Sequence, residues 1–118
     1  MSDNRCIITV GLEIGGGKPA ADILEAAGFP WTHRYGGPHW EDDATRDVLQ
    51  GASAVLAGSE YFNAKTLEGA DQLQVIARNG VGYDKCDLEE CTERGIVVTY
   101  TPGVMADAVA DLSFALLL

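Results

Sequence analysis

The sequence predicts an α/β domain with a doubly wound parallel sheet of about five strands, covered by helices on both faces to give three α/β/α layers. Three observations predict it. Short apolar runs rich in β-branched residues alternate along the chain with longer mixed segments of helical character. The runs lack a strict in-out alternation, which is typical of parallel strands buried on both faces. A chain of 118 residues, 47% of them apolar, has room for one such domain and not two.

The predicted strands share an apolar composition and are separated by turn or helix signals. In chain order they are residues 6–12 (CIITVGL), residues 32–35 as a weaker strand, residues 53–57 (SAVLA), residues 73–77 (LQVIA) and residues 96–100 (IVVTY).

Between these strands the sequence predicts helices at residues 20–27, 41–49, 63–70 and 88–94. Pro19 stands at the start of the first of these helices and Gly28 ends it. Asp87 is expected to cap the last one, and Glu90 occupies the third helical position, where a capping box places Glu or Gln.

Residues 104–118 form a further predicted helix. Its polar residues are Asp107, Asp111 and Ser113, and every other position is apolar. A helix that is apolar on most sides is normally buried on most sides. We therefore expect this segment to continue into further structure or to pack against a partner.

The charge balance excludes several classes of partner. Eight Lys and Arg stand against eighteen Asp and Glu, which leaves a net charge of −10. Such a surface repels phosphate backbones and anionic lipid, so we expect neither a nucleic-acid nor a membrane partner. The sequence shows no export signal and no apolar stretch long enough to cross a bilayer. We therefore expect a cytoplasmic protein, with Cys6, Cys86 and Cys91 as reduced thiols buried like small apolar residues.

Two glycine-rich loops are candidates for ligand binding. Residues 15–18 (GGGK) do not form a phosphate loop, because Leu12 and Pro19 occupy the positions where that motif needs Gly and Ser or Thr. Residues 79–84 (NGVGYD) follow an apolar strand and precede a helix, so they lie at the carboxyl edge of the sheet, where ligands bind in open α/β folds.

The loop at residues 79–84 has the chemistry of an anion site without a cationic side chain. Gly80 and Gly82 allow the main chain to turn its N–H groups toward a ligand, and such groups can hold a carboxylate. A dinucleotide fingerprint would need a third Gly where this sequence has Lys85, so the loop is not predicted to bind a dinucleotide. The alternative is a tight turn in which Asp84 or Asp87 caps the next helix.

For other polar residues, the sequence allows both a functional and a purely structural role. Arg78 ends the fourth strand and either faces an acidic substrate or pairs with a carboxylate on a neighbouring loop. His33 and His39 are the only histidines and have no spaced carboxylate partner, so no metal site is predicted. No nucleophile and base can be paired from the sequence.

Several linked motifs carry a family resemblance. They are VIAR (residues 75–78), GVGYD (80–84), ERGI (93–96), TPG (101–103) and AVAD (108–111). With these motifs, residues 73–118 resemble the D-isomer-specific 2-hydroxyacid dehydrogenases, which include phosphoglycerate dehydrogenase. Residues 53–73 fit the same family loosely, and residues 1–52 match it only in their alternation of strands and helices.

The resemblance implies a domain plan and a set of roles. Residues 1–103 would be an incomplete flavodoxin-like substrate-binding domain, and residues 104–118 the hinge helix that leads to a Rossmann domain beyond Leu118. The main-chain N–H groups of Val81 and Gly82 would hold the substrate carboxylate, with Asn79 and Gly80 shaping the loop.

By the same resemblance, Val109 would lie near the nicotinamide of NAD or NADP. The family's catalytic Arg, Glu and His come from later sequence, so no catalytic residue is assigned in this chain. A homodimer is expected.

Two departures from the family pattern bear on the substrate. Met105 stands where many relatives have Asn, and Ala57–Gly58 stand where phosphoglycerate dehydrogenases usually carry Arg-Ser. The second departure disfavours a phosphorylated substrate. The resemblance thus predicts the substrate-binding portion of an NAD(P)-dependent dehydrogenase acting on a small 2-oxo or 2-hydroxy acid, inactive by itself. The alternative is a stand-alone binding or interaction module without enzymatic activity.

Overall fold

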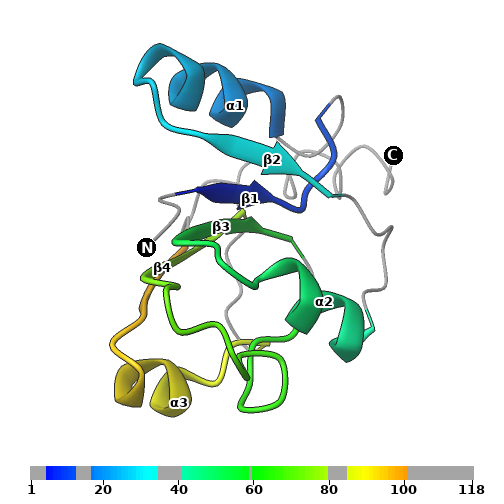
Figure 1. The fold of residues 1–118 in the computed structure, drawn as a ribbon, viewed down its shortest axis with the longest axis vertical. Coiled ribbons are helices and arrows are strands. Elements are labelled where there is room, and N and C mark those ends of the chain that lie inside the picture. Colours follow the sequence, from blue (N-terminus) through cyan, green and yellow to red (C-terminus); the bar gives the residue numbers. More distant parts are fainter. Residues whose placement is uncertain (1–4, 13–16, 35–40, 59, 80–84, 101–118) are drawn as a thin grey trace, which may run out of the picture.

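A five-stranded parallel sheet organises the chain in a computed structural model, which describes residues 5–12, 17–34, 41–58, 60–79 and 85–100. The strand order is β2-β1-β3-β4-β5, the order of flavodoxin-like folds, and the direction in which strands are added reverses after β2 (Figure 1). The predicted fold class is confirmed. The strands are β1 (Cys6–Ile8), β2 (Trp31–His33), β3 (Ala54–Ala57), β4 (Val75–Arg78) and β5 (Val97–Thr99).

The central strands are apolar on both faces, as the lack of in-out alternation predicts. In β3, Val55 and Ala57 belong to one buried cluster, whereas Leu56 packs against a second cluster on the opposite face. β1 pairs in parallel with both β2 and β3, and all three of its side chains are buried. Both faces of these strands therefore need a covering layer.

Among the described residues, three helices supply these layers: α1 (Gly17–Ala26), α2 (Asp42–Val48) and α3 (Leu88–Glu93). In Figure 1, α1 lies on one side of the sheet and α2 and α3 lie on the other, which makes the three predicted layers. Within the described ranges, no helix has the length and apolar character needed to span a bilayer.

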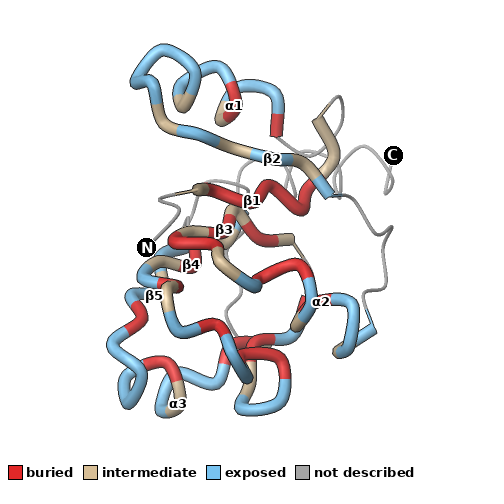
Figure 2. Tube along the Cα trace, in the orientation of Figure 1, coloured by how far each residue is buried: buried red, intermediate tan, exposed pale blue. Residues whose placement is uncertain are grey.

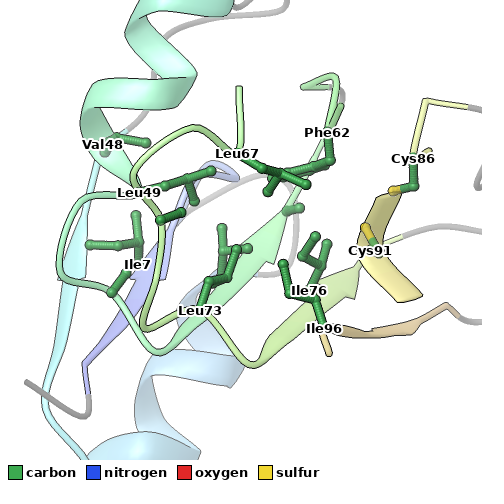
Figure 3. Close-up of a cluster of buried hydrophobic side chains, with 14 residues drawn as sticks. Ile7, Val48, Leu49, Phe62, Leu67, Leu73, Ile76, Cys86, Cys91 and Ile96 are labelled. Carbon is green, nitrogen blue, oxygen red and sulfur yellow. The ribbon is translucent and has the colours of Figure 1, made fainter. Parts of the chain in front are cut away.

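The core is divided into two clusters by the sheet. The larger one lies between the sheet and the layer that holds α2 and α3, and includes Leu49, Phe62 and Ile76, each fully buried (Figure 3). The smaller one, under α1, consists of Cys6, Ile8, Val10 and Ala21 with partly buried neighbours. Figure 2 shows the buried residues concentrated along the central strands and the inner parts of the covering segments.

The start of α3 confirms one half of the expected capping box. The Asp87 carboxylate accepts a hydrogen bond from the Glu90 N–H at 3.1 Å, which satisfies a free donor of the first turn. The Glu90 carboxylate does not complete the box; it pairs with Arg94 at 2.8 Å. The N–H of Asp87 instead donates to the carbonyl of Phe62 at 2.8 Å, so the helix start is joined to a distant segment.

The prediction of a helix over residues 63–70 is wrong: the structure has consecutive turns there. The Asn63 side chain accepts from the N–H groups of Lys65 and Thr66, and the Thr66 hydroxyl oxygen accepts from the Asn63 N–H, as at a capped helix start. One helical bond follows, from the Leu67 N–H to Asn63 O at 2.9 Å, but the Glu68 N–H then donates to Lys65 O, three residues back, so the helix does not continue. Gly69 then has a φ of +80°, which ends any right-handed helical run.

Element boundaries differ from the predicted ones mainly at β1, which ends at Ile8 instead of residue 12. The chain then turns toward α1, since the carbonyls of Gly11 and Leu12 each accept an N–H of α1 at 3.1 Å. A side chain at Gly17 would place its Cβ 2.9 Å from the Gly11 oxygen, so this close approach requires glycine. The predicted hinge helix at residues 104–118 lies outside the described residues, and the domain boundary at residue 103 stays a prediction.

Candidate functional site

The carboxyl edge of the sheet, where β1, β3 and β4 end side by side, is the candidate functional site. In this strand order, ligands bind where the order reverses, next to β1 and β3. The main chain stays paired just past the strands: the Thr9 N–H donates to Leu56 O at 3.0 Å, and the Asn79 N–H donates to Ala57 O at 2.9 Å. Main-chain hydrogen bonds to β3 therefore fix the positions of the residues that directly follow β1 and β4.

Asn79 is the sequence-predicted site residue that the structure describes. It is exposed, directly follows β4, and lies at this edge beside the end of β3. The predicted site residues Gly80, Val81 and Gly82, and also Val109, lie outside the described residues. Their roles stay predictions from the sequence and the family resemblance.

Glu60 is a buried acid at this edge that sequence reasoning missed. Its side chain is 1% exposed, and the two carboxylate oxygens accept hydrogen bonds from the Thr9 hydroxyl at 2.5 Å and the Gly58 N–H at 2.9 Å. A buried carboxylate is tolerated only when it is hydrogen-bonded in this way. One sequence signal could have found it: Glu60 is the single charged residue between Asp47 and Lys65, three positions after a strand.

Arg78 reaches from the end of β4 to the end of β3. Its Nη1 donates to the carbonyl oxygen of Gly58, and the contact is partly buried. The sequence left two alternatives for this side chain, an acidic substrate or a carboxylate on a neighbouring loop. The structure adds a third partner, the main chain of the loop that follows β3.

The Ala57–Gly58 pair, which departs from the phosphoglycerate dehydrogenase pattern, is packed tightly at the same edge. Ala57 is fully buried in the larger core cluster. A Cβ at Gly58 would lie 3.1 Å from Val10 Cγ1 and 3.3 Å from Glu60 Oε1, closer than an ordinary contact. The end of β3 therefore presents main-chain groups and not a cationic side chain at this edge.

Of the two histidines and the first glycine-rich loop, the structure describes His33, Gly17 and Lys18. His33 lies at the end of β2, and its Nε2 is 2.9 Å from the carbonyl oxygen of Val10. His39, Gly15 and Gly16 lie outside the described residues, while Lys18 pairs with Asp22 on the surface of α1 at 2.7 Å. In the part of the chain that the structure describes, no three His, Cys, Asp or Glu side chains cluster as metal ligands.

The cysteines are buried, as predicted, and two of them are visible in Figure 3. The pKa of the Cys91 thiol is raised to about 11, first by burial and then by the neighbouring Cys86, Asp87 and Glu90, against a smaller lowering by Arg94. Burial also raises the pKa of Cys6. Since the thiolate is the reactive form, the raised pKa values disfavour Cys6 and Cys91 as nucleophiles at neutral pH.

Comparison with known proteins identifies the family. Residues 19–115 match the family model described as D-isomer specific 2-hydroxyacid dehydrogenase, catalytic domain. The chain is similar to the glyoxylate reductase of Thermofilum pendens, with 35% identity over 101 residues that cover 86% of this chain and 28% of that protein. With the glyoxylate reductase of Thermococcus litoralis it shares 64% identity over 60 residues, 51% of this chain and 18% of that protein.

The crystal structure of a Thermus thermophilus protein has the same fold, with a TM-score of 0.84 and 35% identity over 97% of this chain and 35% of that one. The chain belongs to the D-isomer-specific 2-hydroxyacid dehydrogenase family, and the matching part is the family's catalytic domain. It spans 18% and 28% of the length of the two glyoxylate reductases.

Proposed function

We propose that this domain binds the acid substrate of an NAD(P)-dependent D-2-hydroxyacid dehydrogenase, which transfers a hydride between a nicotinamide and a small 2-oxo or 2-hydroxy acid. The position of Asn79 carries the proposal: it begins the loop at residues 79–84 at the carboxyl edge, beside the end of β3. In this proposal the N–H groups of Val81 and Gly82 hold the substrate carboxylate, and Asn79 and Gly80 shape the loop. Main-chain N–H groups can bind an anion without a cationic side chain, which is consistent with the net charge of −10 of this chain.

A small, unphosphorylated acid is the proposed substrate class. Both relatives described above carry the name glyoxylate reductase. The buried Ala57 and the glycine after it support the same class, because an arginine that could bind a phosphate is missing from these two positions.

A bound nicotinamide cofactor would supply the hydride. The loop after β4, however, lacks the sequence of a dinucleotide-binding loop. Position 85, where a dinucleotide loop needs its third glycine, is Lys85, and its side chain lies over the Tyr61 ring at 5.2 Å from the centroid. The strict sequence G-x-G-x-x-G does not occur in the 118 residues. We therefore assign only Val109 to the neighbourhood of the cofactor, and we propose that these residues alone catalyse no hydride transfer.

A titration of the uniformly ¹⁵N-labelled 118-residue protein with sodium glycolate tests the proposal. We expect saturable amide shifts concentrated in residues 79–84, because the carboxylate binds main-chain N–H groups there. Methyl glycolate, the neutral ester, is the matched control and is expected to cause no such shifts. Equal shifts with the ester, or saturable shifts confined to another part of the molecule, would contradict the assignment. With NADH and glyoxylate, the same sample is expected to leave the cofactor unoxidised.

An apolar groove supports a second candidate function, that of an interaction module. The groove lies between α1 and the strands β3 and β4, has a volume of about 220 Å³, and is lined by Ile23, Leu56, Val75 and Ala77 among others. Ile23 is 70% exposed and lines the groove, so it adds to one contiguous apolar surface of the kind that marks interaction sites. A second copy of the chain is the proposed partner, in keeping with the expected homodimer.

Light scattering on a size-exclusion column tests this second function. The proposed homodimer is expected to have twice the 12.5 kDa mass of one chain. Ile23→Glu is expected to shift the mass toward that of a monomer, because it places a charge in the groove. A monomeric wild-type protein at millimolar concentration would remove the homodimer.

A further inference from the structure

Two oppositely charged side chains form hydrogen bonds with the main-chain N–H group and carbonyl oxygen of Gly58. The Glu60 carboxylate accepts from the Gly58 N–H at 2.9 Å, and the Arg78 guanidinium donates to the Gly58 carbonyl oxygen. When both the N–H group and the carbonyl oxygen of a residue are hydrogen-bonded, rotation about the main-chain bonds of that residue is restricted. We call this arrangement, made of Glu60, Gly58 and Arg78, the Gly58 clamp.

Both contacts of the clamp are of the strong type. Hydrogen bonds that involve an ionised partner are about twice as strong as neutral ones. Glu60 is 1% exposed, so water does not compete for it, and its second oxygen is bonded to the Thr9 hydroxyl after β1. The lack of a side chain at Gly58 permits the close approach, since a Cβ there would crowd Glu60 Oε1 at 3.3 Å.

The clamp joins the ends of the three strands that form the candidate site. Glu60 connects the segment after β3 to the segment after β1, and Arg78 connects the last residue of β4 to the end of β3. Asn79, the residue after Arg78, is itself bonded through its N–H to Ala57 O at 2.9 Å. The point from which the loop at residues 79–84 departs is therefore set by side chains from two other segments.

We propose that Glu60 and Arg78 are positioning residues, which act through the main chain of Gly58 to fix the starting point of the acid-binding loop. They raise the affinity for a carboxylate without touching it, because N–H donors held in place lose less entropy on binding. This inference rests on the proposed function, and it adds two residues that the family comparison does not assign.

Variants that differ only in the ability to make each bond test the clamp. Arg78→Met keeps an unbranched, flexible apolar stem and removes the donors, whereas Arg78→Lys keeps a donor. Glu60→Ala removes both acceptors, whereas Glu60→Gln keeps an acceptor for the Gly58 N–H and can donate to Thr9. Arg94→Met is the matched control, because Arg94 also donates to a main-chain carbonyl, that of Leu67 at 2.9 Å, outside the clamp.

Two measurements on the 118-residue protein are made for each variant: glycolate affinity from the amide titration, and hydrogen exchange at the Asn79 N–H. Arg78→Met and Glu60→Ala are expected to weaken glycolate binding about tenfold, because the N–H donors of the loop are no longer held in place before binding, and to speed exchange at Asn79. Arg78→Lys and Glu60→Gln are expected to remain within about threefold of wild type. Arg94→Met is expected to lower stability without changing either quantity at the site.

The two readouts separate the clamp from the proposed function. Wild-type affinity in both Arg78→Met and Glu60→Ala would overturn the positioning role, as would equal losses in Arg94→Met. Should the wild-type protein bind no glycolate, the proposed function fails, and unchanged exchange at Asn79 would overturn the clamp separately. Should Glu60→Ala not fold, the Arg78→Met and Arg78→Lys pair decides the result by the same criteria.

Discussion

Replacing Phe62 with Ala is expected to lower the free energy of unfolding by about 3–5 kcal/mol, the usual loss for a large aromatic side chain removed from a core. Phe62 is fully buried in the larger core cluster (Figure 3). It also anchors the irregular segment that precedes β4: its N–H donates to Lys85 O at 2.9 Å, and its carbonyl accepts from Asp87 N–H at 2.8 Å. A domain of this size is stable by about 5–15 kcal/mol, so the variant is expected to be marginally folded.

Chemical denaturation followed by circular dichroism measures this loss. Tyr61→Ala is the matched control, because it truncates the neighbouring aromatic residue, which is 50% exposed, and is expected to change stability by less than about 1 kcal/mol. A loss below 1 kcal/mol for Phe62→Ala, or equal losses for the two variants, would show that this segment does not contribute to the core as the structure describes.

Replacing Gly82 with Val is expected to remove most of the affinity for glycolate. The proposed function places the carboxylate on the N–H groups of Val81 and Gly82, in a loop whose alternating glycines permit backbone conformations that a β-branched residue disfavours. A hydrogen bond to a charged group contributes about 1.5–3 kcal/mol, so the loss of one donor weakens binding by about 10- to 150-fold.

Isothermal calorimetry or the amide titration checks this expectation. Gly28→Val is the control: Gly28 has a positive φ, of +71°, and lies in the turn that leads into β2, at the opposite edge of the sheet. The control variant is expected to lose stability through backbone strain and to bind glycolate normally. Unchanged glycolate affinity in Gly82→Val would remove the carboxylate site from this loop.

Much of the fold was predictable because the determining signals are local. Five apolar runs, their turn residues and the Asp87 cap identify the strands and α3 without knowledge of the neighbours in space. The prediction failed at residues 63–70, where Asn63 and Thr66 cap a first turn but Gly69, with a φ of +80°, ends the run. The end of this run is held by a long-range contact, from Gln50 Nε2 to Glu68 O at 3.1 Å, which an apolar periodicity does not contain.

The candidate site was predictable only in part. The sequence by itself places Asn79 after a strand of a parallel sheet, and the family motifs around it identify the acid-binding loop as a hypothesis. Only the tertiary structure brings Glu60 to the Thr9 hydroxyl, 51 residues away, and Arg78 to Gly58, 20 residues away. These contacts exist because β1, β3 and β4 are neighbours in the sheet. That order is set by long-range strand pairing and core packing, and not by the composition of any one strand.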